Sequence, residues 1–315
     1  MKYVGWDKQP QFVVPGTAGF LGQMRDLQSH MKQVHFGGTR LEINSRLPRM
    51  PCVNFMADAD MYQGALRQAS AFVKQLAVPC LNHPDAIAAT GRDAVARSLA
   101  GIDGVHMPVT VKVRVERLAQ LQQAMADAGI HYPLLVRMAG DHNGVSTVLV
   151  KDASDWEALN PLPWGGRDVY LTQFVDFADA DGRYRKMRLV VVGDKVFGRH
   201  CFISGQWLVH WKARLPDSDD EEAAFIRNFD HDTLPGVAAP VAGIARRLGL
   251  DFFGIDASLR PDGRLLVFEA NATMNILSVQ GERPEIWAGA AARVEAALRE
   301  LLAQPGRWRG APAGV

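Results

Sequence analysis

The hydrophobic pattern is clearest after the first fifty residues, where a short apolar run at 52–56 precedes a segment with helical spacing. Apolar residues recur every three or four positions between Met61 and Leu76, and a second apolar run follows at 78–81. Asp58 or Asp60 stands where a residue would cap this helix. A strand, a helix and a second strand in this order predict a parallel α/β unit.

The middle of the chain predicts a smaller unit. Three segments are rich in β-forming residues: 110–115, 133–138 and 147–150. An amphipathic helix is expected over 118–128, and Gly129 stands where the glycine that ends a helix belongs. The segment 139–146 reads as a glycine-containing loop between two strands. We therefore expect a compact α+β unit over 106–175, with this loop at its tip.

The last 140 residues predict a second, larger sheet. Five β-rich segments are separated by turn-forming residues: 170–177, 187–192, 196–202, 252–259 and 264–271. Helical spacing marks two further segments, 237–248 and 284–302. The acidic segment 218–229 is expected to be a solvated surface element, and the tail after Pro305 is expected to be frayed.

Composition places the chain among globular proteins. It has 315 residues, of which 48% are hydrophobic and 22% are charged, and its formal net charge is +1. This balance argues against a disordered chain, and it lacks the basic excess that is typical of general nucleic-acid binding. The three cysteines are scattered and no apolar stretch is long enough to span a membrane, so a cytoplasmic protein without membrane or nucleic-acid partners is expected.

The strongest chemical signal lies in the last predicted hairpin. Because side chains alternate along a strand, Glu269 and Asn271 share one face, and folding the hairpin brings Asp256 diagonally close to Glu269. Two carboxylates and an amide oxygen form the kind of hard-oxygen set that suits Mg²⁺. The alternative is two surface acids and a polar turn residue on an ordinary hairpin. The dense apolar neighbours of Glu269, Phe268 and Ala270, favour the metal site.

The hairpin resembles the metal-binding hairpin of the ATP-grasp superfamily, in which Gly-x-Asp, a turn and Glu-x-Asn follow one another. Here the corresponding residues are Gly254-Ile255-Asp256 and Glu269-Ala270-Asn271. Other segments resemble further parts of that family in the same order: PCLNHPDAIAATGRD from Pro79, MPVTV from Met107, PLLVRMAGDHNGVSTVLV from Pro133, YLTQFVDF from Tyr170 and RKMRLVVVGDKVFGRH from Arg185. The RimK-like and D-alanine–D-alanine ligase-like carboxylate–amine ligases are the most similar branch.

The resemblance implies an α/β (α+β) chain with the ATP-grasp fold and a division into units. An N-terminal α/β domain would span 1–105, a small lid unit 106–175 and a larger unit with the metal hairpin 176–304, followed by a flexible tail at 305–315. ATP would lie between the small and the large unit. Clefts at such junctions can close over the phosphates and exclude water.

The resemblance also implies roles for individual residues. Asp256, Glu269 and Asn271 would hold Mg²⁺ (or Mn²⁺), and Arg188 and Arg199 would be the catalytic arginines that meet the transferred phosphoryl group. The residues implied to bind ATP are Arg137, Gly140, Gly144, Gln173, Phe174, Val175, Asp176 and Arg188.

Three departures from the family's pattern stand out. Arg137 replaces the usual lysine at the phosphates, which keeps the charge but gives it a planar geometry. Ala272-Thr273-Met274-Asn275 replaces the usual Pro-Gly turn beside the acceptor site, and only Arg92 corresponds loosely to an earlier nucleotide-binding cation.

Several of these residues also have structural interpretations. Arg185, Lys186 and Arg188 would equally suit a solvated strand face, and Trp207 and Trp211 would suit core packing. His200 and His210 are more often hydrogen-bonded or surface histidines than catalysts.

The implied activity is an ATP-dependent carboxylate–amine ligase that works through an acyl-phosphate and releases ADP and phosphate. Its partners would be a small-molecule or peptide carboxylate and an amine, and a homodimer is one assembly that the resemblance allows. Two alternatives stay open: a non-catalytic, regulatory ATP-binding protein with the same fold, and an enzyme that uses a thiol acceptor or acts as a kinase.

Overall fold

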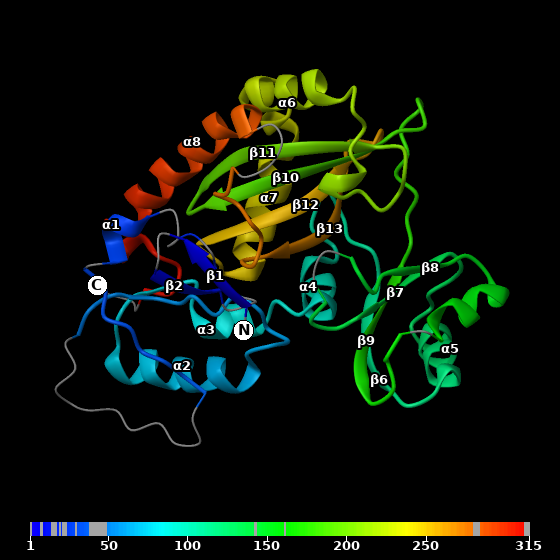
Figure 1. Cartoon of the computed structure of the whole chain (residues 1–315), viewed down its shortest axis with the longest axis horizontal. Coiled ribbons are helices and arrows are strands. Elements are labelled where there is room, and N and C mark those ends of the chain that lie inside the picture. Colours follow the sequence, from blue (N-terminus) through cyan, green and yellow to red (C-terminus); the bar gives the residue numbers. More distant parts are fainter. Residues whose placement is uncertain are drawn as a thin grey trace.

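The computed structural model describes residues 2–6, 9–13, 18, 20, 24–28, 30–37, 49–141, 144–160, 162–279 and 284–311. Two main sheets organise these residues, with strand orders β11-β10-β12-β13-β5 and β6-β9-β7-β8 (Figure 1). Two further pairs, β1-β2 and β3-β4, lie at the N-terminal end. Helices and sheets are mixed along the chain, which confirms the predicted α/β class.

The strands are β1 (Lys2–Trp6), β2 (Gln9–Val13), β3 (Cys52–Val53), β4 (Cys80–Leu81), β5 (Val105–His106), β6 (Thr110–Val115), β7 (Leu134–Met138), β8 (Val148–Val150), β9 (Arg167–Gln173), β10 (Tyr184–Val192), β11 (Lys195–Ser204), β12 (Phe252–Leu259) and β13 (Leu265–Asn271). The α-helices are α1 (Arg25–Gln28), α2 (Gln63–Leu76), α3 (Pro84–Ala88), α4 (Arg92–Leu99), α5 (Leu118–Asp127), α6 (Asp219–Asp232), α7 (Leu234–Leu248) and α8 (Pro284–Leu302). No helix in these described ranges is long and apolar enough to cross a membrane.

The N-terminal α/β unit forms as the pattern predicts. Strands β3 and β4 pair in parallel, and α2 connects them and buries its apolar face. The expected cap is wrong, because Tyr62 precedes the helix without a side-chain cap. Asp58 instead closes a turn before the helix, where its Oδ1 accepts hydrogen bonds from the amides of Asp60 and Met61 at 2.8 and 2.9 Å.

The small unit has a core of its own. Its four-stranded sheet is covered on one side by α5 (Figure 1), and Leu121 from this helix packs with strand residues such as Leu134 and Leu171. The helix ends at Asp127 with Ala128 as its cap, and Gly129 follows with a φ of +64° that glycine readily adopts, as the sequence predicts.

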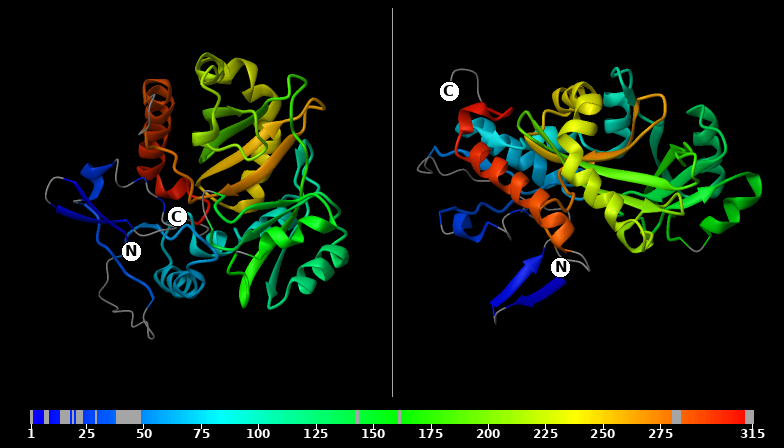
Figure 2. Two further views of the ribbon diagram at one scale, coloured as in Figure 1. Left: turned by 45° about the vertical axis from the view of Figure 1, so that its right-hand side comes forward. Right: turned by 90° about the horizontal axis from the view of Figure 1, so that it is seen from above.

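The large sheet shares its core with the N-terminal region. One hydrophobic cluster includes Leu66 and Leu99 from that region together with Leu189 and Phe253 from the sheet. The two hairpin turns form where predicted, with Gly193 and Gly263 at positive φ. Figure 2 shows the small unit at one end of the molecule and the β1-β2 ribbon at the other. The unit boundaries at 105 and 175 stay a prediction.

The predicted frayed tail is wrong for residues 305–311, while 312–315 lie outside the described residues. Trp308 is buried, and its indole Nε1 donates to the carbonyl of Leu301 at 2.7 Å. The amide of Arg309 donates to Oδ1 of the buried Asp251 at 2.6 Å. An aromatic residue and a carboxylate therefore anchor a segment that has no regular pattern in sequence.

The predicted solvated character of the acidic segment is wrong at one position. The segment lies in α6, and Glu222 on its inner face is fully buried. Its Oε1 accepts from the indole of Trp287 at 2.9 Å, and Arg214 lies 3.0 Å from its Oε2. A buried cation and an indole donor stabilise the carboxylate there.

Candidate active site

A row of charged side chains crosses the large sheet. Asp256 on β12 lies opposite Arg188 on β10 and opposite Glu269 on β13. Residues directly opposite each other in antiparallel strands project from the same face of the sheet. The predicted convergence of Asp256 and Glu269 is therefore present in the register. The two lie directly opposite rather than diagonally, because a β-bulge next to Asp256 shifts the pairing by one residue.

Asp256 is held by two cations. It is 2% exposed, and Arg188 donates to both its oxygens, from Nε to Oδ1 at 2.7 Å and from Nη2 to Oδ2 at 3.0 Å. Lys186 Nζ lies 3.4 Å from Oδ2. Burial by itself raises the pKa of this carboxyl, but the charges of Arg188 and Lys186 lower the pKa well below its usual range. The side chains of Arg188 and Lys186 are only 16% and 20% exposed, so a solvated strand face is excluded for these two.

Glu269 is contacted from a different part of the chain. Arg92, the first residue of α4, forms an ion pair with its Oε2. Burial raises the pKa of Glu269, whereas the charges of Arg92 and Arg137 lower it, and the net shift is downward. Arg137 comes from β7 in the small unit, so this carboxylate is in contact with a guanidinium from α4 and is also affected by the charge of a second one from the small unit. The sequence pointed only loosely to Arg92.

Burial also affects Arg137 itself. It lowers the pKa of this guanidinium to about 10, and the nearby charge of Arg92 acts in the same direction. One Arg137 nitrogen, Nη2, donates to the carbonyl of Asp141, and its buried Nε has no hydrogen-bond partner among the described residues. Arg137 therefore retains an unused donor beside the cation–carboxylate row.

Two of the three predicted metal ligands suit a magnesium ion. Asp256 and Glu269 are carboxylates on neighbouring strands, and Mg²⁺ commonly takes one or two carboxylates together with phosphate and water. The Oδ1 of Asn271 already accepts from the amide and hydroxyl of Thr273 at 3.0 and 2.7 Å, so its use as a ligand requires that turn to open. Among the residues that the structure describes, no three His, Cys, Asp or Glu side chains form a metal-binding group by themselves. The donor set therefore fits a metal that is shared with phosphate.

The glycine loop lies between β7 and β8. Gly140 and Gly144 have φ values of +73° and +71°, which explains glycine at both positions. Oδ2 of Asp141 accepts from the amide and hydroxyl of Ser146 at 2.8 and 2.7 Å, which closes the base of the loop. Leu208, from the segment after β11, lies 3.4 Å from where a Cβ on Gly144 would stand. Residues 142 and 143 lie outside the described residues.

The predicted adenine-binding residues connect the two sheets. Gln173 uses its side chain within the small unit, because Nε2 donates to the carbonyls of His131 and Pro133 at 3.1 and 3.0 Å. Phe174 packs edge-on against Trp207 at 5.7 Å between ring centroids. Asp176 accepts from the amide of Ala178 at 3.2 Å. Because these side chains already have partners, adenine would be contacted mainly by backbone atoms and by Phe174. The adenine-binding role of this segment stays a prediction.

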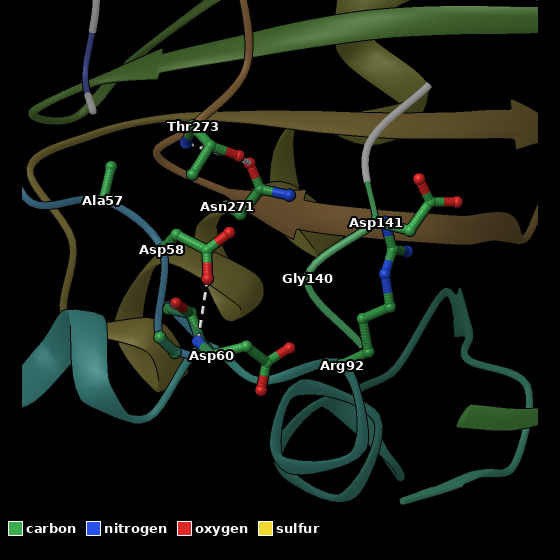
Figure 3. A pocket seen from close by; sticks show the side chains of 10 residues that line it. Ala57, Asp58, Asp60, Arg92, Gly140, Asp141, Asn271 and Thr273 are labelled. Atoms are coloured by element: carbon green, nitrogen blue, oxygen red, sulfur yellow. Dashed lines mark hydrogen bonds between the residues drawn. The ribbon is translucent and has the colours of Figure 1, made fainter. Parts of the chain in front are cut away.

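A polar hollow lies where the segment before α2, the start of α4, the glycine loop and the end of β13 meet (Figure 3). It holds about 400 Å³ of space, which includes open solvent. Figure 3 shows the Asp58 carboxylate pointing toward Asn271 and the Arg92 side chain rising from α4 toward the backbone at Gly140 and Asp141. The lining residues are Ala57, Asp58, Ala59, Asp60, Thr90, Arg92, Gly140, Asp141, Asn271 and Thr273. The sequence pattern gave Asp58 and Asp60 only a capping role.

Arg199, predicted to be catalytic, holds the backbone that follows the hairpin. Its Nε donates to the carbonyl of Ile276 at 2.5 Å and its Nη2 to that of Ser278 at 2.6 Å. Arg188 donates in the same way to the carbonyl of Asn275 at 3.0 Å. Arg188 therefore holds the last residue of the segment 272–275, and Arg199 holds the backbone that directly follows it.

Comparisons with known proteins give a structural likeness only. No protein-family pattern matches the sequence, and no curated protein is similar to it in sequence. A RimK-domain ATP-grasp protein from Sphaerobacter thermophilus is 19% identical, with a TM-score of 0.46 over 78% of this chain and 81% of that one. The VanG D-Ala:D-Ser ligase from Enterococcus faecalis is 14% identical, with a TM-score of 0.48 over 75% of this chain and 68% of that one. A RiPP-associated ATP-grasp ligase from Chryseobacterium gregarium is 16% identical, with a TM-score of 0.48 over 80% and 72% of the two chains.

Proposed function

We propose that the protein is an ATP-dependent ligase that joins a carboxylic acid to an amine through an acyl-phosphate. The observation that supports this most directly is the row in which Arg188, Asp256 and Glu269 lie side by side on one sheet face. Carboxylates that suit Mg²⁺, next to arginines that suit a transferred phosphoryl group, are the parts that phosphoryl transfer needs. The order of the sequence motifs, which resembles the ATP-grasp ligases, favours amide formation among such reactions.

The residues divide the binding of ATP between the two sheets. Asp256 and Glu269 would hold Mg²⁺ or Mn²⁺ from the large sheet, and Arg137 and the glycine loop would hold the phosphates from the small unit. When bound, the metal ion would neutralise charge on the phosphates. The connecting segment from Gln173 to Asp176 would line the adenine and the ribose.

The chain's own contribution to the reaction is positioning and fixed charge. A free carboxylate is a poor acylating agent, and transfer of the γ-phosphoryl group to one of its oxygens gives it a leaving group. Attack by the amine nitrogen then forms the C–N bond, breaks the C–O bond to phosphate and releases the nitrogen's proton to phosphate or water. Arg188 and Arg199 are mostly buried, so their charges act in a medium of low polarity, where they stabilise developing negative charge more strongly than in water.

The alternatives differ in what they require of this row. A regulatory ATP-binding protein needs no preserved pair of carboxylates, so the presence of both Asp256 and Glu269 favours an enzyme. A kinase or a ligase with a thiol acceptor would use the same row, and only the products separate them from an amide-forming ligase. The three free cysteines fit the proposed cytoplasmic location.

The proposed reaction is tested by trapping its intermediate. The protein is incubated with Mg-ATP, hydroxylamine and a panel of carboxylic acids, amino acids and short peptides. Because hydroxylamine is a small nucleophile, it can replace the amine and convert an acyl-phosphate into a hydroxamate. We expect a hydroxamate, with ADP and phosphate, only when ATP and one class of acid are both present.

The matched test variant is Glu269→Gln, which keeps the side-chain shape and removes one charge from the row. Hydroxamate formation should fall by about a hundredfold or more, since loss of one preorganised electrostatic contact commonly costs about 2.7–4 kcal/mol. ADP formation with phosphate retained on a stable product would show a kinase. ATP binding without acid-stimulated ADP formation would favour the regulatory protein.

A further inference from the structure

His200 is placed at the end of the charged row by an irregularity in strand pairing. Arg188 lies opposite His200, but the next residue, Leu189, lies opposite Gly198, so Arg199 is an extra residue in a β-bulge. Gly198 is required there, because a Cβ at this position would lie 2.6 Å from the ring of Phe229. His200 therefore projects from the same sheet face as Arg188 and, through it, Asp256.

The imidazole of His200 is fixed and buried but incompletely bonded. The residue is 6% exposed, and its ring stacks on Phe202 with 3.9 Å between centroids and 4° between planes. Its buried Nε2 has no hydrogen-bond partner among the described residues, and neither has Nη1 of the neighbouring Arg199. A buried polar group without a partner costs about 1–3 kcal/mol, so an ordinary packing histidine would be expected to have one.

The charges around His200 limit what can bind to it. Burial lowers the pKa of the imidazole well below its usual value, and the charges of Arg188, Arg199 and Lys186 lower it further, against the opposite effect of Asp256. The lowered pKa favours the neutral imidazole, which donates from Nε2 in the tautomer that carries its hydrogen there. With three cations nearby, an oxygen that carries negative charge is the partner that best suits the unpartnered Nε2 of His200 and Nη1 of Arg199.

We propose that His200 is a further catalytic residue of the ligase, an inference that rests on the proposed function. Its Nε2–H donates to the oxygen that stays on the acyl carbon. When the amine nitrogen attacks, the C=O electron pair moves onto this oxygen, which then accepts from His200 and Arg199. Collapse re-forms C=O, breaks the bond to the phosphate oxygen and expels phosphate, while the nitrogen loses its proton to phosphate or water.

The position of His200 separates its role from nucleotide binding. Along the sheet it lies beyond Arg188, on the side away from Asp256 and Glu269. In the proposed reaction, an acid that contacts His200 would therefore lie across Arg188 from the carboxylates proposed to hold the metal, and it would not share their contacts with ATP. Loss of His200 should therefore affect the acyl group and leave ATP affinity nearly unchanged.

The test compares two substitutions with the full chain and the acid that gives the highest hydroxamate yield in the panel. His200→Phe keeps a ring to stack on Phe202 and removes the donor, and we expect acid-dependent kcat to fall about a hundredfold. His200→Gln supplies a side-chain N–H and should recover activity to within about tenfold of the unaltered protein. The KM for ATP should change less than about threefold in both. His231→Gln, an exposed histidine on α6, is the control and should change neither value.

Folding is checked by the urea midpoint and by Mg-ATP affinity, which both His200 variants should retain. His200→Phe with kcat within twofold of the unaltered protein would overturn the inference while leaving the proposed function intact. The donor role is also overturned if the Gln variant is as impaired as the Phe variant and the rate of the unaltered protein rises with pH through a histidine titration. These two results together would identify His200 as a base. If no acid in the panel stimulates ADP formation by the unaltered protein, the proposed function itself is contradicted.

Discussion

At the residue scale, the site depends on a few side chains, and strand register determines the sheet face from which each one projects. The alternation of side chains was enough to predict that Asp256 and Glu269 converge, because both stand on recognisable strands. It could not predict the extra residue that aligns them, since a β-bulge leaves no clear mark in one sequence. It also could not predict Arg92, which reaches Glu269 from a helix 177 positions away in the chain.

Two arginines on opposite sides of the proposed cleft should respond differently to removal. Arg188 contacts Asp256 and, in the proposed reaction, would lie where charge develops during transfer, so Arg188→Met should lower kcat by about a hundredfold and change the KM for ATP much less. Arg137 lies beside the glycine loop with an unused donor, so Arg137→Met should mainly weaken ATP binding, by about tenfold. Steady-state kinetics and equilibrium titration with ATP distinguish these effects. Normal binding and turnover in both variants would make the two arginines structural.

At the element scale, the helices and strands with strong periodicity were predicted within a few residues. Helix α8 spans the predicted 284–302, and the β12-β13 hairpin turns where predicted. For elements with weak patterns, the sequence did not predict which side chains are buried or what they contact. The acidic run of α6 predicts exposure for all its members, but the helix turns Glu222 toward Trp287 and Arg214. Such burial depends on tertiary neighbours, which a local pattern does not contain.

The start of α4 should compete with the metal ion for Glu269. Arg92 is paired with this carboxylate in the structure, and both side chains are about a quarter exposed, at 26% and 24%. An ion pair of this kind contributes up to about 1 kcal/mol, so Arg92→Met should raise the Mn²⁺ affinity of the protein bound to a non-hydrolysable ATP analogue by roughly fivefold. Electron paramagnetic resonance of free Mn²⁺ measures this directly. Arg97→Met on the same helix, whose partner is Asp93, is the control and should leave Mn²⁺ affinity unchanged. Weaker Mn²⁺ binding in the Arg92 variant would mean that this arginine supports the metal site instead.

At the scale of the whole molecule, the N-terminal unit and the C-terminal segment are joined through a residue of the large sheet's entry, Asp251. Asp251, just before β12, accepts from the amide of Asn82 at 2.8 Å and from the amide of Arg309 at 2.6 Å. Asn82 in turn accepts from the amides of Asp251 and Phe252 at 2.8 and 3.0 Å. The N-terminal unit and the C-terminal segment are thus fixed to the strand that carries Asp256. No sequence pattern predicts this link, because its members are single polar residues far apart in the chain.

The C-terminal segment should therefore contribute strongly to stability. Trp308 is 4% exposed and packs into the main core, so Trp308→Ala leaves a large cavity and removes one of the two hydrogen bonds to the Leu301 carbonyl, which the amide of Gln304 also contacts at 3.0 Å. Core substitutions of this size destabilise by about 3–5 kcal/mol, and the midpoint of urea unfolding should fall accordingly. Arg307→Ala, at an exposed position one residue earlier, should shift the midpoint little and is the matched control. If Trp308→Ala unfolds at the same urea concentration as Arg307→Ala, packing of the C-terminal segment against the core does not contribute to stability. If the urea midpoint falls only in Trp308→Ala and this variant also binds ATP more weakly, the anchor also keeps β12 and its carboxylate in register with β10.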